Sequence, residues 1–276
     1  MVLTETVVRK RLYSSQSEAQ KGVIFLFSLL TGNRRSPGGA PPSLCLPPPK
    51  PRSLAAMCNL YSVTKGQSAI RDLFRVTHDR AGNMPPLTGV FPDQLAPIVR
   101  IAANGGRELV MARWGMPGPP QFGGRPVTNI RNLLSPHWRR WLGPMSRCIV
   151  PATAFCEYDD TKPKKTPNWF ALAEDRPLFA FAGLWTPWTG LRGPKSAPVE
   201  GDHELFGFLT TDPNAVVAPI HAKAMPVILT TPDEVDAWLA AATADAFALQ
   251  RPLPDERLQI VAKGELYDFG EVLPQL

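Results

Sequence analysis

The stretch RCIVPATAFCEY, at residues 147–158, decides the fold prediction because it joins β-type sequence to reactive side chains. Its apolar run Cys148–Val150 predicts a strand, and Glu157 follows the next apolar residues. Short runs of the same type recur at Leu95–Ile101, Glu108–Arg113, Trp169–Leu172, Phe179–Leu184, Leu205–Thr210, Val227–Thr230 and Leu258–Ala262. We therefore predict a protein built mainly from short strands.

Helical patterns are fewer than strand patterns. Thr64–Val76 places apolar residues at helical spacing behind a threonine that can cap, and Asn132–Leu142 is also helical in pattern. Thr231–Leu239 has a cap, a proline at the first helical position and early acids, which predicts a helix start. Because strands outnumber helices and do not alternate with them, we predict an α+β fold with a mixed or antiparallel sheet. Pro187–His203 is rich in Gly and Pro and predicts a surface loop.

Composition excludes several classes of protein. The chain has 276 residues, of which 44% are hydrophobic and 20% charged, which is typical of a globular protein. No apolar run approaches the roughly 20 residues that cross a bilayer. The four cysteines are irregularly spaced and predict no disulfide framework, which favours a reducing compartment. No P-loop, GxGxxG or CxxC motif is present, so we expect no cofactor.

The first 56 residues differ from the rest of the chain. They hold eight Lys and Arg against two acids, which accounts for the whole net charge of +6 and leaves 22 basic and 22 acidic residues in 57–276. Their proline-rich end, at residues 36–51, predicts extended or disordered chain. A secretory signal fits poorly, because more than 20 residues separate the apolar run at 23–30 from Ala55, and a transit peptide fits poorly because the proline-rich end does not suit an amphipathic helix. The high pI therefore carries no argument for nucleic acid.

Four segments carry reactive side chains: MCNLY at 57–61, WGMP at 114–117 with TNIRN at 128–132, residues 147–158, and IHAKAMPVIL at 220–229. Each has an ordinary explanation when taken alone. A single cysteine is commonly a small buried hydrophobe, a glutamate after a strand is commonly the first solvated residue, and a histidine before a strand is commonly a loop residue.

Together and in this order, the four segments closely resemble the SRAP family, the SOS response-associated peptidases that bind abasic sites in single-stranded DNA. The resemblance covers 57–276 and implies a single domain with a barrel-like sheet core and flanking helices. It also implies a covalent DNA–protein cross-link that shields the lesion during the DNA damage response, with self-cleaving peptidase and lyase activities. The implied catalytic residues are Cys58 as nucleophile, Asn129 holding the cysteine end, Glu157 as acid/base group and His221 in proton transfer or phosphate contact.

The same resemblance and the run of arginines between residues 100 and 147 suggest a set of DNA contacts. Arg131 matches a phosphate contact, and Lys223 stands where the family often has arginine. Leu60 departs from the family's Met-Cys-Gly-Arg start and removes one phosphate contact. The full set of expected DNA-binding residues is Arg131, Trp114, Gly115, Lys223 and Arg147, with the Trp114-Gly115 turn wedged against bases.

The expected chemistry requires Cys58 to be the first residue of the chain. An abasic sugar opens to an aldehyde, and an N-terminal cysteine offers an amine and a thiol that together close on it as a thiazolidine. A cysteine within a chain has no free amine and cannot form this ring. We therefore expect residues 1–56 to be a start-site overcall or a removable leader, and 57–276 to be the SRAP domain.

Two other functions stay open at this point. One is a thiol peptidase that acts on other polypeptides, with Cys58 or Cys156 activated by His221 and Glu157. The other is a non-covalent single-stranded DNA-binding module. A metal site is disfavoured, because His221 and Cys156 lack partners at ligand spacing. The expected partner is single-stranded DNA with abasic sites, without membrane contact, and the protein is expected to be a cytoplasmic, nucleoid-associated monomer.

Overall fold

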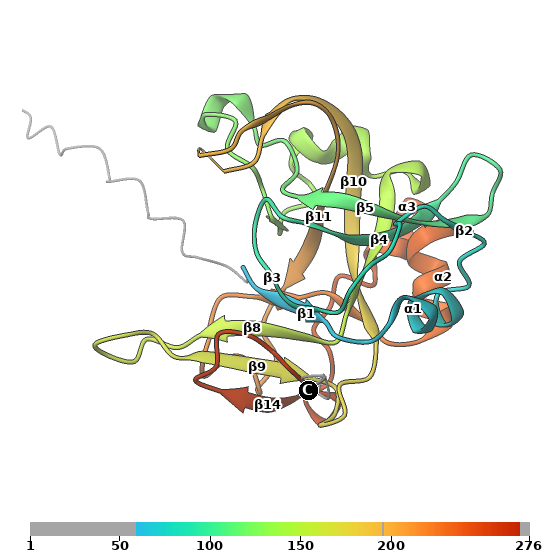
Figure 1. The fold of residues 1–276 in the computed structure, drawn as a ribbon. Coiled ribbons are helices and arrows are strands. Elements are labelled where there is room, and N and C mark those ends of the chain that lie inside the picture. The colour runs from blue at the N-terminus through green and yellow to red at the C-terminus, as the bar shows by residue number, and fades with distance from the viewer. Residues whose placement is uncertain (1–58, 195, 271–276) are drawn as a thin grey trace, which may run out of the picture. The chain divides into compact units, whose positions relative to one another are not determined.

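Two sheets form the fold in the computed structural model, which describes residues 59–194 and 196–270 (Figure 1). The smaller sheet has five strands in the order β14-β9-β8-β1-β3. Their bounds are β1 (Tyr61–Val63), β3 (Leu87–Val90), β8 (Ala154–Tyr158), β9 (Pro167–Ala171) and β14 (Gln259–Lys263). All four pairings in this sheet are antiparallel.

The larger sheet closes on itself. Its main strands are β4 (Leu95–Ile101), β5 (Arg107–Trp114), β7 (Arg147–Ala152), β10 (Phe179–Arg192) and β11 (Val199–Thr211). Antiparallel pairings run in the order β5-β4-β7-β10-β11, and a parallel pairing of β11 with β5 joins the two ends. Closure removes the exposed edges of an open sheet. The predicted α+β fold with a mixed, barrel-like sheet is confirmed.

Short strands extend the barrel at its rim. They are β2 (His78–Asp79), β6 (Asn129–Ile130), β12 (Met225–Pro226) and β13 (Ile228–Leu229). β6 pairs in parallel with β11, which sets Asn129 opposite Phe208. A Cβ on Gly207 would lie 3.1 Å from the carbonyl oxygen of Val127, so the segment before β6 approaches β11 closely only because residue 207 is glycine.

The helices are short and flank the sheets. They are α1 (Gln67–Leu73), α2 (Pro232–Ala240) and α3 (Thr243–Phe247), with 3₁₀ turns η1 (Pro120–Phe122), η2 (Pro136–Trp141), η3 (Pro144–Ser146) and η4 (Asp255–Arg257). None of the helices in the described part of the chain has the length and apolar character to span a bilayer.

Of the three helices predicted from the sequence, one begins as predicted, one has a different N-cap and one is reduced to a 3₁₀ turn. The prediction at Thr231 is confirmed, since its side chain and that of Glu234 form a reciprocal capping box. The prediction that Thr64 caps α1 is wrong: Gly66 is the N-cap, and the Thr64 hydroxyl donates to Thr153 Oγ1 at 3.1 Å. The helix expected at Asn132–Leu142 is reduced to the 3₁₀ turn η2.

The segment Pro187–His203 is not the predicted surface loop. β10 and β11 continue through it as a hairpin, paired as far as Arg192 opposite Val199 (Figure 1). Gly190 and Gly201 lie directly opposite each other with φ of 152° and 140°, a conformation that L side chains rarely adopt. Glycine here allows an unusual backbone conformation within paired strands, so its abundance wrongly predicted a loop.

An aromatic cluster fills the core. The Tyr61 ring lies 5.2 Å from Trp114 and 5.7 Å from Phe181, both edge to face, and Trp114 stacks on Phe208 at 5.1 Å. All four side chains are fully buried. Each such ring contributes about 1.5–3 kcal/mol by leaving water, so this cluster joins β1 of the small sheet firmly to the barrel.

Candidate functional site

The site lies where the first described residues run beside β8. The backbone N–H of Cys156 donates to the carbonyl oxygen of Leu60 at 2.9 Å, and Tyr61 pairs with Phe155. This pairing brings residues 59 and 60 alongside the strand that carries Glu157. Cys58 itself lies outside the described residues.

Two successive hydrogen bonds link Asn59 to Asn129, the first residue of β6. The amide of Asn129 donates to Thr128 Oγ1 at 3.0 Å, and the Thr128 hydroxyl donates in turn to Asn59 Oδ1 at 3.4 Å. Asn129 is 8% exposed. Asn59, the residue directly after Cys58, is thus linked to Asn129 through Thr128, and the expected role of this asparagine in holding the cysteine end stays a prediction.

Glu157 and His221 form the titratable pair of the site. Glu157 Oε2 lies 3.9 Å from His221 Nδ1, and their side chains are 4% and 13% exposed. The His221 Nδ1 also lies 2.8 Å from the carbonyl oxygen of Ala224. Because a carbonyl only accepts, Nδ1 carries a proton, and in the neutral ring the lone pair is on Nε2. The pair therefore combines a carboxyl largely shielded from water with an imidazole of fixed orientation.

The turn that carries His221 is built from the segment before it. Backbone N–H groups of Ala218 and His221 donate to the carbonyl oxygens of Asn214 and Val217, at 2.9 and 2.8 Å. The Asn214 side chain accepts from the Val217 N–H at 3.0 Å and donates to the Leu253 carbonyl at 3.0 Å. These contacts fix the turn that carries the histidine and tie it to Leu253, which is distant in sequence.

Two of the expected DNA contacts follow candidate catalytic residues closely in the sequence. Arg131 follows Asn129 by two residues, is 39% exposed and forms an ion pair with Asp212. Lys223 follows His221 by two residues and is exposed. Both cations are thus accessible on segments that carry a candidate catalytic residue, and their contact with DNA stays a prediction.

Trp114 and Arg147 need correction, because both are fully buried. The Trp114 indole N–H donates to the carbonyl of Thr128 at 3.0 Å and its ring packs in the barrel core, so the ring is not exposed to stack on a base. Gly115 is also buried, with φ of 146°. The Trp114-Gly115 turn positions the segment before Asn129 and is not an exposed wedge.

Arg147 stabilises the end of α2 from inside the fold. Its guanidinium donates to the carbonyl oxygens of Leu142 at 3.0 Å, Trp238 at 3.2 Å and Ala241 at 2.7 Å. A fourth bond reaches Thr243 Oγ1 at 3.1 Å. These acceptors use four of the five N–H groups of a side chain that is fully buried, so the prediction of a phosphate contact is wrong for this residue.

Cys156 is unsuited to act as a nucleophile. It is fully buried, and burial raises the pKa of its thiol to about 12, with the charge of Glu157 acting in the same direction. Burial also raises the pKa of the Cys148 thiol. Since the thiolate is the reactive form, the open alternative that used Cys156 is not supported. Within the described residues, no group of three or more His, Cys, Asp or Glu is placed to hold a metal ion.

Thr128 and Asn59 were missed as site residues by the sequence analysis. Both belong to the quoted segments, and each is adjacent to a candidate catalytic residue, Asn129 and Cys58. Their link across the site depends on the β6–β11 pairing, for which the sequence carries no signal.

Comparison with known proteins places these residues in a family context. A family model described as SOS response associated peptidase (SRAP) matches residues 57–263. The abasic site processing protein YoqW of Bacillus subtilis is 33% identical over 177 residues, which cover 61% of this chain and 73% of YoqW. The abasic site processing protein YobE of the same species is 31% identical over 179 residues, covering 61% and 75% of the two chains.

Solved structures share the fold. A protein from Bordetella bronchiseptica superposes with a TM-score of 0.58 at 25% identity, covering 75% of this chain and 98% of that one. A protein from Bacteroides thetaiotaomicron has a TM-score of 0.56 at 22% identity, covering 74% and 90%. The second similarity shows the fold alone.

Proposed function

The chain belongs to the SOS response associated peptidase family, and from this premise we propose that it processes abasic sites in single-stranded DNA by a covalent cross-link through Cys58. One observation carries the proposal. Asn59, which follows Cys58, is linked to Asn129 through Thr128. Leu60 accepts a hydrogen bond from β8, the strand that carries Glu157 of the buried Glu157–His221 pair. The names of the Bacillus relatives, abasic site processing proteins, support the same substrate.

The proposed reaction is a condensation. The amine of Cys58 attacks the C1′ aldehyde of the opened abasic sugar, and loss of one water gives an imine. The thiol then adds to the imine carbon, and its proton goes to the nitrogen, which closes a five-membered thiazolidine. Because two bonds must reopen to release the DNA, this product is more durable than the imine alone.

The buried pair supplies the proton transfers. Glu157 donates a proton to the sugar ring oxygen as the ring opens, and takes part again in the loss of water. His221 acts as the second proton-transfer group or contacts a phosphate, and Asn129 holds the cysteine end. Arg131 and Lys223 contact phosphates of the single strand, and the protein acts as a monomer on DNA in the cytoplasm.

The mechanism needs a free amine on Cys58, so the active form begins at that residue. We propose that residues 1–57 are absent from the active form, either through translation from Met57 and removal of that methionine or through self-cleavage. The family match beginning at residue 57 supports this boundary. Self-cleavage would be the peptidase activity of the protein.

A denaturing gel tests the cross-link. Protein that begins at Cys58 is mixed with single-stranded DNA that carries one abasic site, and a shifted band is expected. Three matched proteins should give no band: Cys58→Ala, the form with one alanine added before Cys58, and the full 276-residue chain if it is not cleaved. The added alanine keeps the thiol and blocks only the amine, so a band from that form would contradict the thiazolidine.

The Glu157→Gln variant tests the acid/base role. The amide keeps the size of the side chain but cannot transfer the proton, so the cross-linking rate should fall about 10²–10⁴-fold while the thermal unfolding temperature changes little. A non-covalent binding module would instead retain DNA equally with or without Cys58 and lose it under denaturing conditions. A peptidase acting on other polypeptides would turn over an added peptide without DNA.

A further inference from the structure

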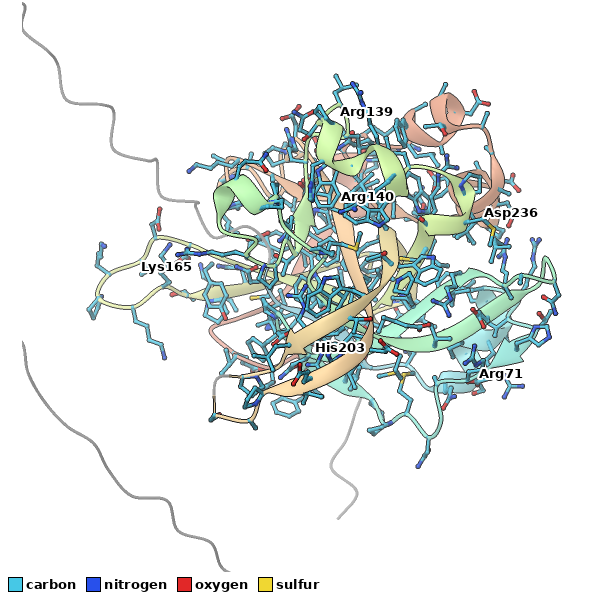
Figure 2. The ribbon with its side chains drawn as sticks, turned by 90° about the horizontal axis from the view of Figure 1, so that it is seen from above. Arg71, Arg139, Arg140, Lys165, His203 and Asp236 are labelled. Atoms are coloured by element: carbon cyan, nitrogen blue, oxygen red, sulfur yellow. The ribbon has the colours of Figure 1, made fainter. Side chains whose placement is uncertain are left out.

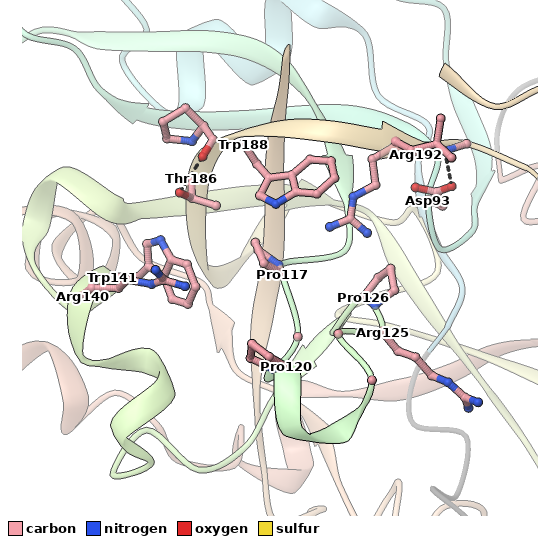
Figure 3. Close-up of a pocket in the computed structure, with 16 residues that line it drawn as sticks. Asp93, Pro117, Pro120, Arg125, Pro126, Arg140, Trp141, Thr186, Trp188 and Arg192 are labelled. Atoms are coloured by element: carbon pink, nitrogen blue, oxygen red, sulfur yellow. Dashed lines mark hydrogen bonds between the residues drawn. The ribbon is translucent and has the colours of Figure 1, made fainter. Parts of the chain in front are cut away.

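A second polar and aromatic site lies at the tip of the β10–β11 hairpin. Here a cleft of about 860 Å³ opens between the hairpin, the segment 117–126 and the turn η2 (Figure 3). Arg125, Arg140 and Arg192 line it, together with the indoles of Trp141 and Trp188. Three cations and two large aromatic rings around one hollow are the side chains that bind phosphates and bases.

Arg192 is the central feature of this cleft. It is 8% exposed, its Nε has no hydrogen-bond partner, and its guanidinium forms no ion pair with any described residue. The guanidinium carbon lies 4.5 Å from the centre of the Trp188 ring. Figure 3 shows the guanidinium beside this ring, over the hollow. A buried N–H without an acceptor is costly, and an anion in the cleft that accepts from Nε would remove that cost.

Asp93 is the one acid among the described lining residues, and its charge favours the Arg192 cation, but the same carboxylate also forms an ion pair with Arg113 at 4.0 Å. Asp93 Oδ2 accepts from the backbone N–H of Gly193 at 2.8 Å, and its main-chain oxygen accepts from Arg113. The cleft therefore keeps an excess of positive charge, three arginines against one aspartate.

Trp188 is held rigidly as a flat surface. His203 stacks on it at 6.0 Å between ring centres, and the His203 Nε2 lies 3.1 Å from the carbonyl oxygen of Gly190. A Cβ on Gly190 would lie 2.3 Å from the Trp188 ring, so the ring occupies the space that any side chain at 190 would need. A fixed indole loses little conformational entropy when a base stacks on it.

The cleft lies close to the site along β11. Thr186, which lines the cleft, is opposite Leu205, and Asn129 is opposite Phe208. Three residues of β11 separate the two positions along the strand, about 10 Å at 3.3 Å per residue, and two strand spacings of about 4.8 Å separate them across the sheet, so the span is about 14 Å. This equals about four nucleotides at 3.4 Å each along a stacked strand. Pro126, on the opposite wall, is three residues before Asn129.

We propose that this cleft binds the DNA strand that flanks the abasic site, with a phosphate on Arg192 and a base stacked on Trp188. The proposal rests on the proposed function and adds a binding site outside the lesion pocket. Arg140, which stacks over Trp141 at 4.0 Å, supplies a second phosphate contact from the other wall. Single-stranded DNA fits better than an acidic peptide, because a peptide carboxylate would use the arginines but not the two indoles.

Fluorescence anisotropy of the full chain with undamaged 20-nucleotide single-stranded DNA, measured over a range of salt, tests the cleft. Trp188→Ala should weaken binding about 5- to 150-fold, which corresponds to one stacked base. Arg192→Met should lower the slope of log affinity against log salt by about 0.7, the loss of one phosphate contact. Arg140 is exposed, so Arg140→Gln should fold normally, and its weaker DNA binding tests the cleft even if the variants at buried positions unfold.

Arg139→Gln is the matched control. Arg139 precedes Arg140 in the same turn, carries the same charge and does not line the cleft, and it projects outward in Figure 2. Loss of affinity in the cleft variants with little change in Arg139→Gln is the expected result. Equal loss in Arg139→Gln and Arg140→Gln, or wild-type affinity and slope in all variants, would overturn the proposal. The proposal would also be overturned if a labelled polyglutamate peptide bound more tightly than the DNA and lost this binding in Trp188→Ala. Cross-linking of a short abasic oligonucleotide by the wild-type protein reports on the proposed function separately.

Discussion

Replacement of Arg147 by methionine separates two roles for this residue, a phosphate contact and an internal cap of α2. The structure supports the second role, since the side chain is fully buried and donates to three carbonyl oxygens and one hydroxyl. Methionine has a similar length and no charge, so the variant removes the hydrogen bonds with little change in volume.

The expected loss of stability follows from the acceptors left behind. A buried acceptor without a partner costs about 1–3 kcal/mol, and three carbonyls set an upper range of about 3–9 kcal/mol. Burial also lowers the pKa of the Arg147 guanidinium, which shows that the cation is partly desolvated, and its removal returns some of this cost. We expect a net destabilisation of about 3–5 kcal/mol, or about 6–20 °C in Tm for a domain of this size.

Urea and thermal unfolding followed by circular dichroism measure this loss. The exposed neighbour Arg139→Met serves as control and should change stability by less than about 0.5 kcal/mol. DNA affinity of the folded Arg147→Met protein is measured in parallel below its Tm. Wild-type stability combined with weaker DNA binding would refute the cap and restore the phosphate contact.

Three further predictions follow from backbone, charge and burial. Gly115→Ala should destabilise by about 1–3 kcal/mol, because φ is 146° and a Cβ there would lie 2.9 Å from a proline ring carbon, whereas Gly143→Ala, with φ of −74° and no atom within 4 Å, should be neutral in the same thermal melts. Burial alone would raise the pKa of Glu234, but hydrogen bonds from Thr230 outweigh it and hold the pKa below the usual 4.5. Its contribution is therefore complete above pH 4.5 and lost as the pH falls through the lower folded value, so Glu234→Gln should cost more stability at pH 7 than at pH 3, and equal costs would contradict this. Cys156 should escape alkylation by iodoacetamide at pH 8 until the protein is unfolded, and peptide mapping that finds it labelled in the native state would disprove its burial.

Local features were predicted well from the sequence, because neighbouring residues decide them. Thr231, Pro232 and Glu234 form a helix start within four residues, and the capping box follows from their own backbone and side chains. The strand Leu95–Ile101 was predicted with its observed bounds, since an apolar run with β-branched residues is favoured in a buried strand. The order of the four reactive segments identified the family.

Features that depend on distant pairing came only from the tertiary structure. The signal for a loop at Pro187–His203 was local, but pairing of β10 with β11 overrode it and created the cleft beside Trp188 and Arg192. Trp114 and Arg147 are residue types that commonly contact DNA, and only the tertiary structure shows that both are buried, Trp114 in the barrel core and Arg147 against the end of α2.

The sequence by itself determined the α+β class, the family and the identity of Glu157 and His221 as candidates, because residue order and local pattern carry that information. The tertiary structure decided which side chains meet. Glu157 lies 3.9 Å from His221, and Asn59 lies beside Thr128, through strand pairings between segments far apart in the chain. Burial and proximity arise from those non-local pairings, and local sequence pattern does not specify them.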